Sequence, residues 1–163
     1  MAISQRIVDH GYAAVMSEIK KADHLYVKVG FPVEGELAAG DAKDISEINL
    51  IAAVQEFGSE KRNVPERSFI RATFDSEYEN LQRFKEHEYL QIVQGKQTAL
   101  MAIGQIGEWL TNKTKGYIRN IIPPPLKEAT KKRKGRGGDS AVPLIDTGQM
   151  INTIQWVITE VKS

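Results

Sequence analysis

Histidine and carboxylate side chains are the groups in this 163-residue sequence that could perform acid–base or metal chemistry, because the chain contains no cysteine. The three histidines, His10, His24 and His87, lie far apart. None has a second histidine at the spacing of about three to five residues that metal sites favour. The segment HEYLQ, which starts at His87, has glutamine where a zinc-protease helix needs its second histidine. The sequence therefore predicts no metal site.

Neither the paired acidic residues nor the closely spaced glycines form a catalytic motif. Glu77 and Glu79 are two residues apart, and on a helix such positions point to different sides, so the pair cannot work as general acid and base. Gly104 and Gly107 fall within an apolar helical stripe, where small residues favour close packing rather than phosphate binding. We therefore expect no catalytic residues, no cofactor and no enzymatic activity.

The distribution of charge is uneven along the chain. The formal net charge is +1, but residues 127–138 carry a net charge of +5, which leaves −4 for the rest. The basic side chains of this segment are Lys127, Lys131, Lys132, Arg133, Lys134 and Arg136. Such a cluster on a glycine-rich segment can neutralise phosphates without selecting a sequence, or it can order against an acidic protein neighbour. Contact with DNA and contact with a protein partner are both open.

The first third of the chain predicts a helix, a strand and a second helix. Apolar residues recur at intervals of three and four over residues 3–21, which indicates an amphipathic helix, and they alternate over residues 25–31, which indicates a strand. Residues 33–44 are rich in glycine, alanine and acidic residues and are expected to form a flexible loop. Helical spacing returns over residues 45–57 and is expected to end at Gly58.

The middle of the chain predicts a long helical hairpin. One amphipathic stretch runs from Pro65 to about Gln94, and a second runs over residues 99–121. The apolar residues along one side of the first are Ile70, Phe74, Tyr78, Leu81 and Phe84. Gly95 lies between them where a helix commonly stops, so the two helices should pack antiparallel. The prolines at 123–125 end the second helix because they supply no backbone donors.

The last forty residues predict a loop, a short helix and a strand. Residues 126–142 are basic and irregular, and a loop of this length is usually functional or disordered. Asp146 and Gln149 have the spacing of a helix-capping box, and residues 154–159 alternate as a strand that could pair with the first. The chain is thus predicted to be one α+β domain over residues 1–163, with a small antiparallel sheet, an N-terminal helix, a long helical hairpin and two flexible loops. No apolar stretch approaches the ~20 residues that cross a bilayer.

Three segments of the chain, in this order, form a recognisable set. The first is VGF at residues 29–31, and the second is AAVQEFG at 52–58 with VPERSFIR at 64–71. The third is PPPL at 123–126, which leads through the basic residues to PLIDTGQM at 143–150. Together they resemble the tailed-bacteriophage family of neck and tail-completion proteins, which includes minor tail protein Z-like and virion morphogenesis proteins. The resemblance spans almost the whole chain.

The resemblance implies a structural virion protein with no catalytic residues. Such a subunit assembles as a ring, here expected to be a hexamer, at the head-to-tail junction. Its partners would be head-connector or head-closure proteins, tail tube or tail terminator proteins, and genomic DNA through non-specific contact. It would reside in the host cytoplasm during assembly and afterwards in the virion. A neck protein and a tail terminator are not separated by the sequence, and a non-sequence-specific nucleic-acid-binding protein is the alternative function.

The motif residues can be given roles in the fold or in an interface. Gly58 would adopt a left-handed conformation, Pro65 would begin the long helix, and Phe69 would anchor that helix on the core. Arg67 would bind carbonyls near the Gly58 turn or pair with Glu56. The full set of motif residues is Glu56, Phe57, Gly58, Pro65, Arg67, Phe69, Asp146, Thr147 and Gly148.

Overall fold

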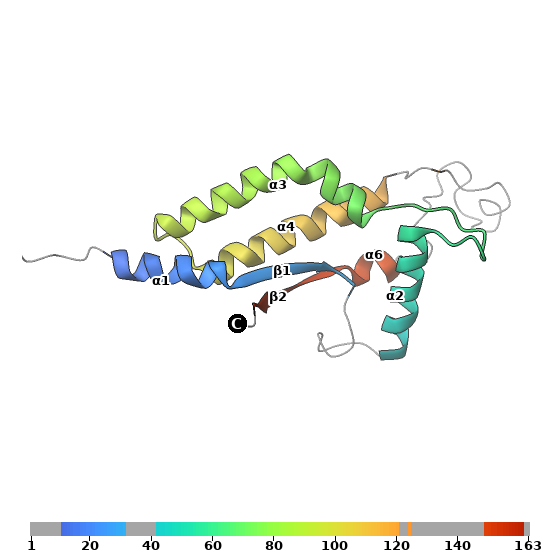
Figure 1. The fold of residues 1–163 in the computed structure, drawn as a ribbon, viewed down its shortest axis with the longest axis horizontal. Helices are drawn as coiled ribbons and strands as arrows, with labels where there is room; N and C mark the ends of the chain where they lie inside the picture. Colours follow the sequence, from blue (N-terminus) through green and yellow to red (C-terminus); the bar gives the residue numbers. More distant parts are fainter. Residues whose placement is uncertain (1–10, 32–41, 121–123, 125–148, 162–163) are drawn as a thin grey trace, which may run out of the picture.

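The computed structural model describes residues 11–31, 42–120, 124 and 149–161, and within them the chain has the predicted α+β fold. The elements in order are α1 (Tyr12–Asp23), β1 (Leu25–Gly30), α2 (Ala42–Phe57), α3 (Ile70–Val93), α4 (Ala99–Arg119), α6 (Gln149–Thr153) and β2 (Gln155–Glu160). Figure 1 shows α3 and α4 side by side along the long axis, with the sheet beside α4 and α2 across one end. None of the described helices is both long enough and apolar enough to span a bilayer.

The helical hairpin of α3 and α4 is built as the sequence predicts. Gly95 has a φ of 67°, and the amides of Gly95 and Lys96 donate to the carbonyls of Ile92 and Gln91, which closes α3 with a Schellman motif. Along the hairpin, the rings of Phe84 and Trp109 stack with their centroids 5.5 Å apart. These contacts fix the register of the two long helices.

The sheet is a pair of antiparallel strands that lies against α4. Its register pairs Leu25 with Glu160 at one end and Gly30 with Gln155 at the other, which confirms the predicted pairing of first and last strand. Among the glycines of α4, Gly107 lies closest to the sheet. A Cβ atom added there would lie 2.6 Å from Cγ2 of Val27 and 2.9 Å from Cγ of Trp156. Gly107 therefore allows the close packing that the sequence suggested.

Two clusters of buried side chains stabilise the two ends of the molecule. At the α2 end, Phe69, Ile118 and Ile154 are fully buried together with residues of α2 and α6. At the α1 end, a smaller cluster is formed by Ile92, Ala99 and Ala102. Burial of such side chains contributes on the order of 1.5 to 3 kcal/mol each for the large ones.

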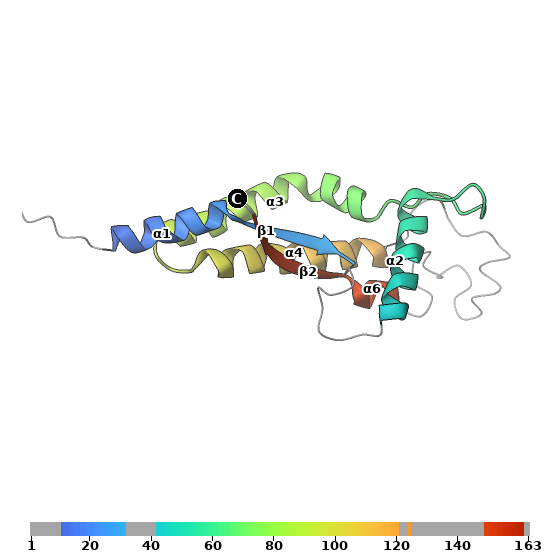
Figure 2. The ribbon, with the colours of Figure 1, turned by 60° about the horizontal axis from the view of Figure 1, so that its bottom comes forward.

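The beginning of α4 is capped by a side chain from a distant part of the chain. Glu18 of α1 accepts a hydrogen bond from the amide of Ala99 at 2.8 Å, and the Thr98 hydroxyl accepts from the amide of Met101 at 3.3 Å. The first amides of a helix have no partner within the helix, so both contacts satisfy groups that would otherwise need solvent. The Glu18 contact also ties α1 to the hairpin. Figure 2 shows α1 beside the end of the hairpin where α3 passes into α4.

The boundaries of three predicted elements are corrected by the structure. The helix expected over residues 3–21 corresponds to α1, which begins at Tyr12 after the left-handed Gly11 and ends at Asp23. The helix expected over residues 45–57 begins at Ala42, so residues 42–44 of the predicted loop are helical. The long helix expected to start after Pro65 begins at Ile70, because residues 59 and 64 pair as an isolated bridge and hold the chain in a turn there. Residues 1–10, the rest of the loop at 33–41 and the loop at 126–142 lie outside the described residues.

Candidate interaction site

Within the described residues, no group of three or more histidine, cysteine, aspartate or glutamate side chains is placed to hold a metal ion. His24 follows α1 as its C-terminal cap residue, whereas His10 lies outside the described residues. His87 is largely exposed on α3, 4.0 Å from the buried carboxylate of Glu88. That carboxylate accepts a hydrogen bond of 2.6 Å from Nε2 of Gln97, so it joins the end of α3 to the hairpin turn.

The carboxylate of Glu56 is the most extensively hydrogen-bonded side chain among the motif residues that the structure describes. It lies at the end of α2, and the residue is 3 % exposed. Oε2 accepts from the amides of Phe69 at 2.7 Å and Ile70 at 3.0 Å, and Oε1 accepts from the hydroxyl of Ser68 at 2.9 Å. Oε1 also accepts from the amide of Arg71 at 3.2 Å. Glu56 therefore caps the first turn of α3 from another helix, which is the arrangement that the partial positive charge of a helix N-terminus favours.

Arg71, not Arg67, is the cation that pairs with Glu56. Nε of Arg71 donates to Oε1 of Glu56 at 3.0 Å, one terminal nitrogen donates to the Glu56 carbonyl at 3.0 Å, and the guanidinium lies 4.8 Å from the ring centroid of Phe57. The predicted Arg67–Glu56 pair is wrong, because Arg67 lies in the extended segment before α3 and turns the other way.

Arg67 joins two other parts of the chain. The residue is 5 % exposed, its amide donates to the carbonyl of Gln55 at 2.8 Å, and its Nε donates to the carbonyl of Pro124 at 3.0 Å. It thus satisfies a carbonyl, as expected, but one beyond the end of α4 rather than one near the Gly58 turn. We name the unit formed by Glu56, Arg67, Phe69 and Arg71 the Glu56 junction.

Within the Glu56 junction, the charges of Glu56 and Arg71 stabilise each other. Burial alone would raise the pKa of Glu56, but hydrogen bonds from the amides of Ile70, Phe69 and Arg71 outweigh burial, and the pKa lies below its ordinary value. The hydrogen bond to Glu56 raises the pKa of Arg71, whereas burial lowers the pKa of Arg67. An ionised carboxylate at this position is thus favoured by the fold.

Acid is expected to destabilise the protein through Glu56. Because the folded-state pKa lies below the ordinary value of 4.5, the stabilisation is fully present above about pH 4.5 and is lost as the pH falls through the folded-state pKa. Urea unfolding measured from about pH 7 to about pH 3 should therefore show a steeper loss of stability in the wild type than in Glu56→Gln, whose side chain does not titrate. Equal slopes for the two proteins would contradict this assignment.

The turn that follows α2 and leads to Arg67 depends on Gly58. Its φ is 74°, and an added Cβ atom would lie 2.9 Å from the amide nitrogen of Glu66. The bridge between Ser59 and Val64 follows, with hydrogen bonds of 2.8 and 3.0 Å. Pro65 lies after this bridge and outside α3. Gly58 therefore has the predicted left-handed conformation, while Pro65 belongs to the turn.

Phe57 and Phe69, the two aromatic motif residues, lie in opposite environments. Phe69 is fully buried and contacts Phe31 edge to face, with ring centroids 6.1 Å apart, so it anchors the start of α3 on the core. Phe57 is 65 % exposed. The other predicted site residues lie outside the described residues: Lys127, Lys131, Lys132, Arg133, Lys134, Arg136, Asp146, Thr147 and Gly148.

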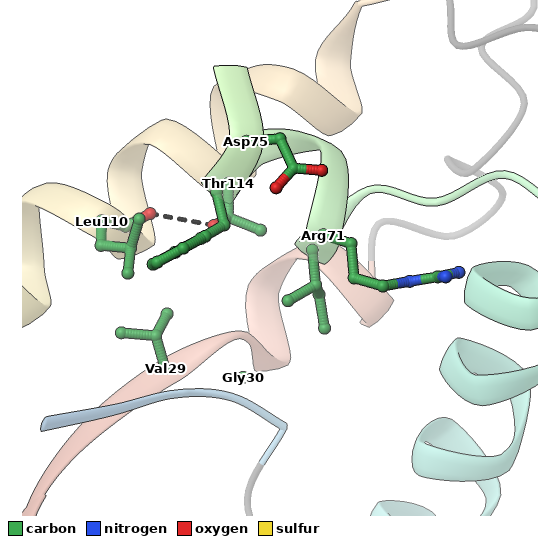
Figure 3. Close-up of a pocket in the computed structure, with 8 residues that line it drawn as sticks. Val29, Gly30, Arg71, Asp75, Leu110 and Thr114 are labelled. Carbon is green, nitrogen blue, oxygen red and sulfur yellow. Dashed lines mark hydrogen bonds between the residues drawn. The ribbon is translucent and has the colours of Figure 1, made fainter. Parts of the chain in front are cut away.

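A cavity that the sequence did not predict lies between β1, α3 and α4. Its volume is about 350 Å³, and its lining includes Val29, Phe74 and Leu110 (Figure 3). The sequence placed Phe74 and Tyr78 on the apolar stripe of α3, but they are 45 % and 49 % exposed. Helical spacing identifies an apolar face, and it carries no signal for whether another element covers that face.

The Glu56 junction and the cavity differ in what they can do chemically. The oxygens of Glu56 are occupied by hydrogen bonds from Ser68, Phe69, Ile70 and Arg71, so the carboxylate acts as a structural acceptor. The cavity is mostly apolar and suits the burial of apolar groups.

Comparison of the chain with models of protein families, with curated proteins and with solved structures found no match in any of the three.

Proposed function

We propose that this chain is a structural virion protein of a tailed phage, a neck or tail-completion protein that forms a ring at the head-to-tail junction. The observation that carries the proposal is the way the resembling segments meet in space. The segment at 52–58 supplies Glu56, and the segment at 64–71 supplies the amides and the arginine that bind it. The two parts of the second segment thus form one hydrogen-bonded structural unit, which supports a role for this motif in the fold rather than in catalysis.

The charge distribution supports contacts between unlike surfaces. Residues 127–138 carry a net charge of +5, while the rest of the chain carries −4. Association of a basic segment with an acidic body on the next copy is favourable, and contacts of this kind generate rings when the rotation closes. Copies of the chain in a ring of six, head-closure proteins and tail tube or terminator proteins are the proposed partners.

Electron microscopy of particles made when the gene is silenced in its phage tests the proposal. Heads, free tails and joined virions are scored separately. Filled heads with unjoined tails, or tails of abnormal length, are the expected result, because the completion step would be missing. A normal number of intact, tailed virions would overturn the proposal.

The alternative function, non-specific nucleic-acid binding, differs in its salt dependence. If the basic segment acts on free DNA, the purified protein should retard DNA in a gel with an affinity that falls steeply as salt rises. Replacement of Lys131, Lys132, Arg133 and Lys134 by serine should abolish that retardation. In the ring role the same variant should instead reduce the titre of filled, tailed particles, and a normal titre would count against a part for this segment in assembly.

A further inference from the structure

The cavity described above lies on the face of the helical hairpin that carries β1, and α1 covers another part of the same face. Ile19 of α1 and Leu25 of β1 pack together against the smaller buried cluster, near the turn of the hairpin. Four residues further along β1, Val29 lines the cavity together with Phe74 of α3 and Leu110 of α4. This face of the hairpin therefore binds a segment of the chain at one end and is open at the other.

The cavity is large enough to take apolar side chains. Its volume is about 350 Å³, and an apolar cavity of about 150 Å³ holds a molecule of the size of benzene. Figure 3 shows Val29 and Leu110 directed into the space, whereas the side chain of Arg71 turns away toward α2. Phe74 forms part of the lining and is 45 % exposed. The cavity thus offers an apolar wall that an entering segment would cover.

The N-terminal part of the chain leaves the body at the opposite end of the molecule. In both ribbon views α1 begins beyond the turn between α3 and α4, at the end away from α2 (Figures 1 and 2). Tyr12, the first residue of α1, is 71 % exposed, and no residue of α1 is buried. We name residues 1–10 the N-terminal arm. Its apolar residues are Ile3, Ile7 and Val8, together with Met1 and Ala2.

The N-terminal arm is too short to fill the cavity of its own copy. The twelve residues of α1 span about 18 Å, and β1 covers about 13 Å between Leu25 and Val29 in the other direction along the long axis. Gly11 therefore lies about 30 Å from the cavity. Even with a fully extended backbone, Ile7 and Val8 remain within about 15 Å of Gly11. Only the arm of another copy can bring these two side chains to the cavity.

We propose that the N-terminal arm of a second copy docks in the cavity, with its apolar side chains against Val29, Phe74 and Leu110. The arm would then cover the open end of the face whose other end α1 covers within the same copy. The contact is heterologous, since arm and cavity lie at opposite ends of the molecule, and it can therefore repeat around a ring. In that respect the inference rests on the proposed function and names the surfaces through which its copies would meet.

Single-cysteine variants test the proposed contact because the natural chain has no cysteine. Arg6→Cys places a thiol on the arm without removing an apolar residue, and Asp75→Cys places one on the exposed part of the cavity lining. Neither variant can form a disulfide within one molecule. When the two are mixed under oxidising conditions, with an affinity tag on one of them to change its mass, a mixed disulfide reports contact between arm and cavity of different copies.

The mixed disulfide is expected to form about tenfold faster than the disulfide between Arg6→Cys and Glu86→Cys, because docking raises the effective concentration of the two thiols. Glu86 is the control because it is exposed on α3, about 16 Å further along the helix than Asp75, and does not line the cavity. The reaction is followed on non-reducing gels, with concentrated purified protein and with particles that contain both variants. Faster cross-linking in either setting supports the contact, and a rate no higher than the control in both would overturn it.

A charge placed on either surface gives a second test. Phe74→Asp, added to Asp75→Cys, should lower the rate to that of the control, because the docked arm would have to bury the carboxylate. Tyr89→Asp is the matched variant, since Tyr89 lies on the same helix with 49 % exposure and does not line the cavity. Both should keep the circular dichroism and the Tm of a folded protein. Equal cross-linking in the two would contradict the proposed surface.

The arm is tested in the same way. Ile7→Asp, added to Arg6→Cys, should lower the rate as Phe74→Asp does, because it places a charge among the apolar side chains of the arm. Gln5→Asp adds the same charge at a polar position and should leave the rate within about twofold of that of the unmodified arm. A loss of cross-linking as large in Gln5→Asp as in Ile7→Asp would show that apolar burial does not hold the arm.

The inference and the proposed function can fail separately. If silencing the gene leaves normal virions while the mixed disulfide forms in purified protein, the ring at the head-to-tail junction is wrong and the contact between copies stands. If silencing gives unjoined heads and tails but neither setting shows faster cross-linking than the control, the function stands and the contact between arm and cavity is wrong.

Discussion

Glu56→Ala is expected to lower the free energy of unfolding by about 2 to 3 kcal/mol, since a buried donor left without its acceptor costs roughly 1 to 3 kcal/mol and the loss of a helix cap costs about 1 kcal/mol. The alanine leaves the amides of Phe69 and Ile70 without their acceptor, and it leaves Arg71 with Glu66 as the one carboxylate that it contacts among the described residues. It also removes the hydrogen bonds by which the Glu56 side chain joins the end of α2 to the start of α3. Urea unfolding followed by circular dichroism measures the loss.

Glu79→Ala is the control for Glu56→Ala. Glu79 lies on α3 with its side chain 86 % exposed, and its contact with Arg83 is 3.7 Å long. Exposed pairs of this kind contribute roughly 0 to 1 kcal/mol, so Glu79→Ala should change stability by less than about 0.5 kcal/mol. If the two variants lost similar amounts of stability, the Glu56 cap on α3 would contribute no more to the free energy of unfolding than an exposed ion pair does.

Gly107→Ala and Gly116→Ala are expected to change stability in opposite directions, although both add one methyl group to α4. At Gly107 the new Cβ atom meets Val27 at 2.6 Å and Trp156 at 2.9 Å, so the sheet must move away from the helix. Overpacking of this kind costs about 1 to 3 kcal/mol, which exceeds the gain of about 1 kcal/mol from the better helix propensity of alanine. A net loss of up to about 2 kcal/mol is expected for Gly107→Ala.

Gly116 isolates the effect of helix propensity. A Cβ atom added there has no neighbour within 4 Å, so Gly116→Ala should raise the free energy of unfolding by about 0.5 to 1 kcal/mol. Thermal and urea unfolding of both variants measure the difference directly. A Gly107→Ala variant as stable as Gly116→Ala would show that the sheet does not pack against α4 as closely as described.

The helices and strands could be predicted from the sequence because their signals are local. Apolar spacing of three and four predicted the two long helices, and Gly95 and Gly58 marked ends that the structure places at the same residues. Alternation predicted both strands, and their pairing in an antiparallel sheet is confirmed. In each case a period or a left-handed glycine depends on neighbouring residues alone, so the chain carries the information without its tertiary context.

The start of α3 and the partner of Glu56 were decided by tertiary structure. Arg67 and Arg71 are four residues apart, and either is long enough to reach Glu56 in principle. The carboxylate binds the amides of Phe69 and Ile70, which sets the beginning of α3. Arg71 then lies in the first helical turn and faces Glu56, while Arg67 lies before the helix and binds Pro124. A hydrogen bond between residues thirteen positions apart leaves no periodic trace in the sequence.

The exposure of apolar residues was likewise decided only by the fold. The sequence determined that Phe74 and Phe69 belong to apolar positions near the start of one helix, yet Phe69 is fully buried and Phe74 is 45 % exposed. The period of a helix states which side chains share a face. Whether that face is covered depends on which element packs against it, and packing involves residues that are distant in the chain.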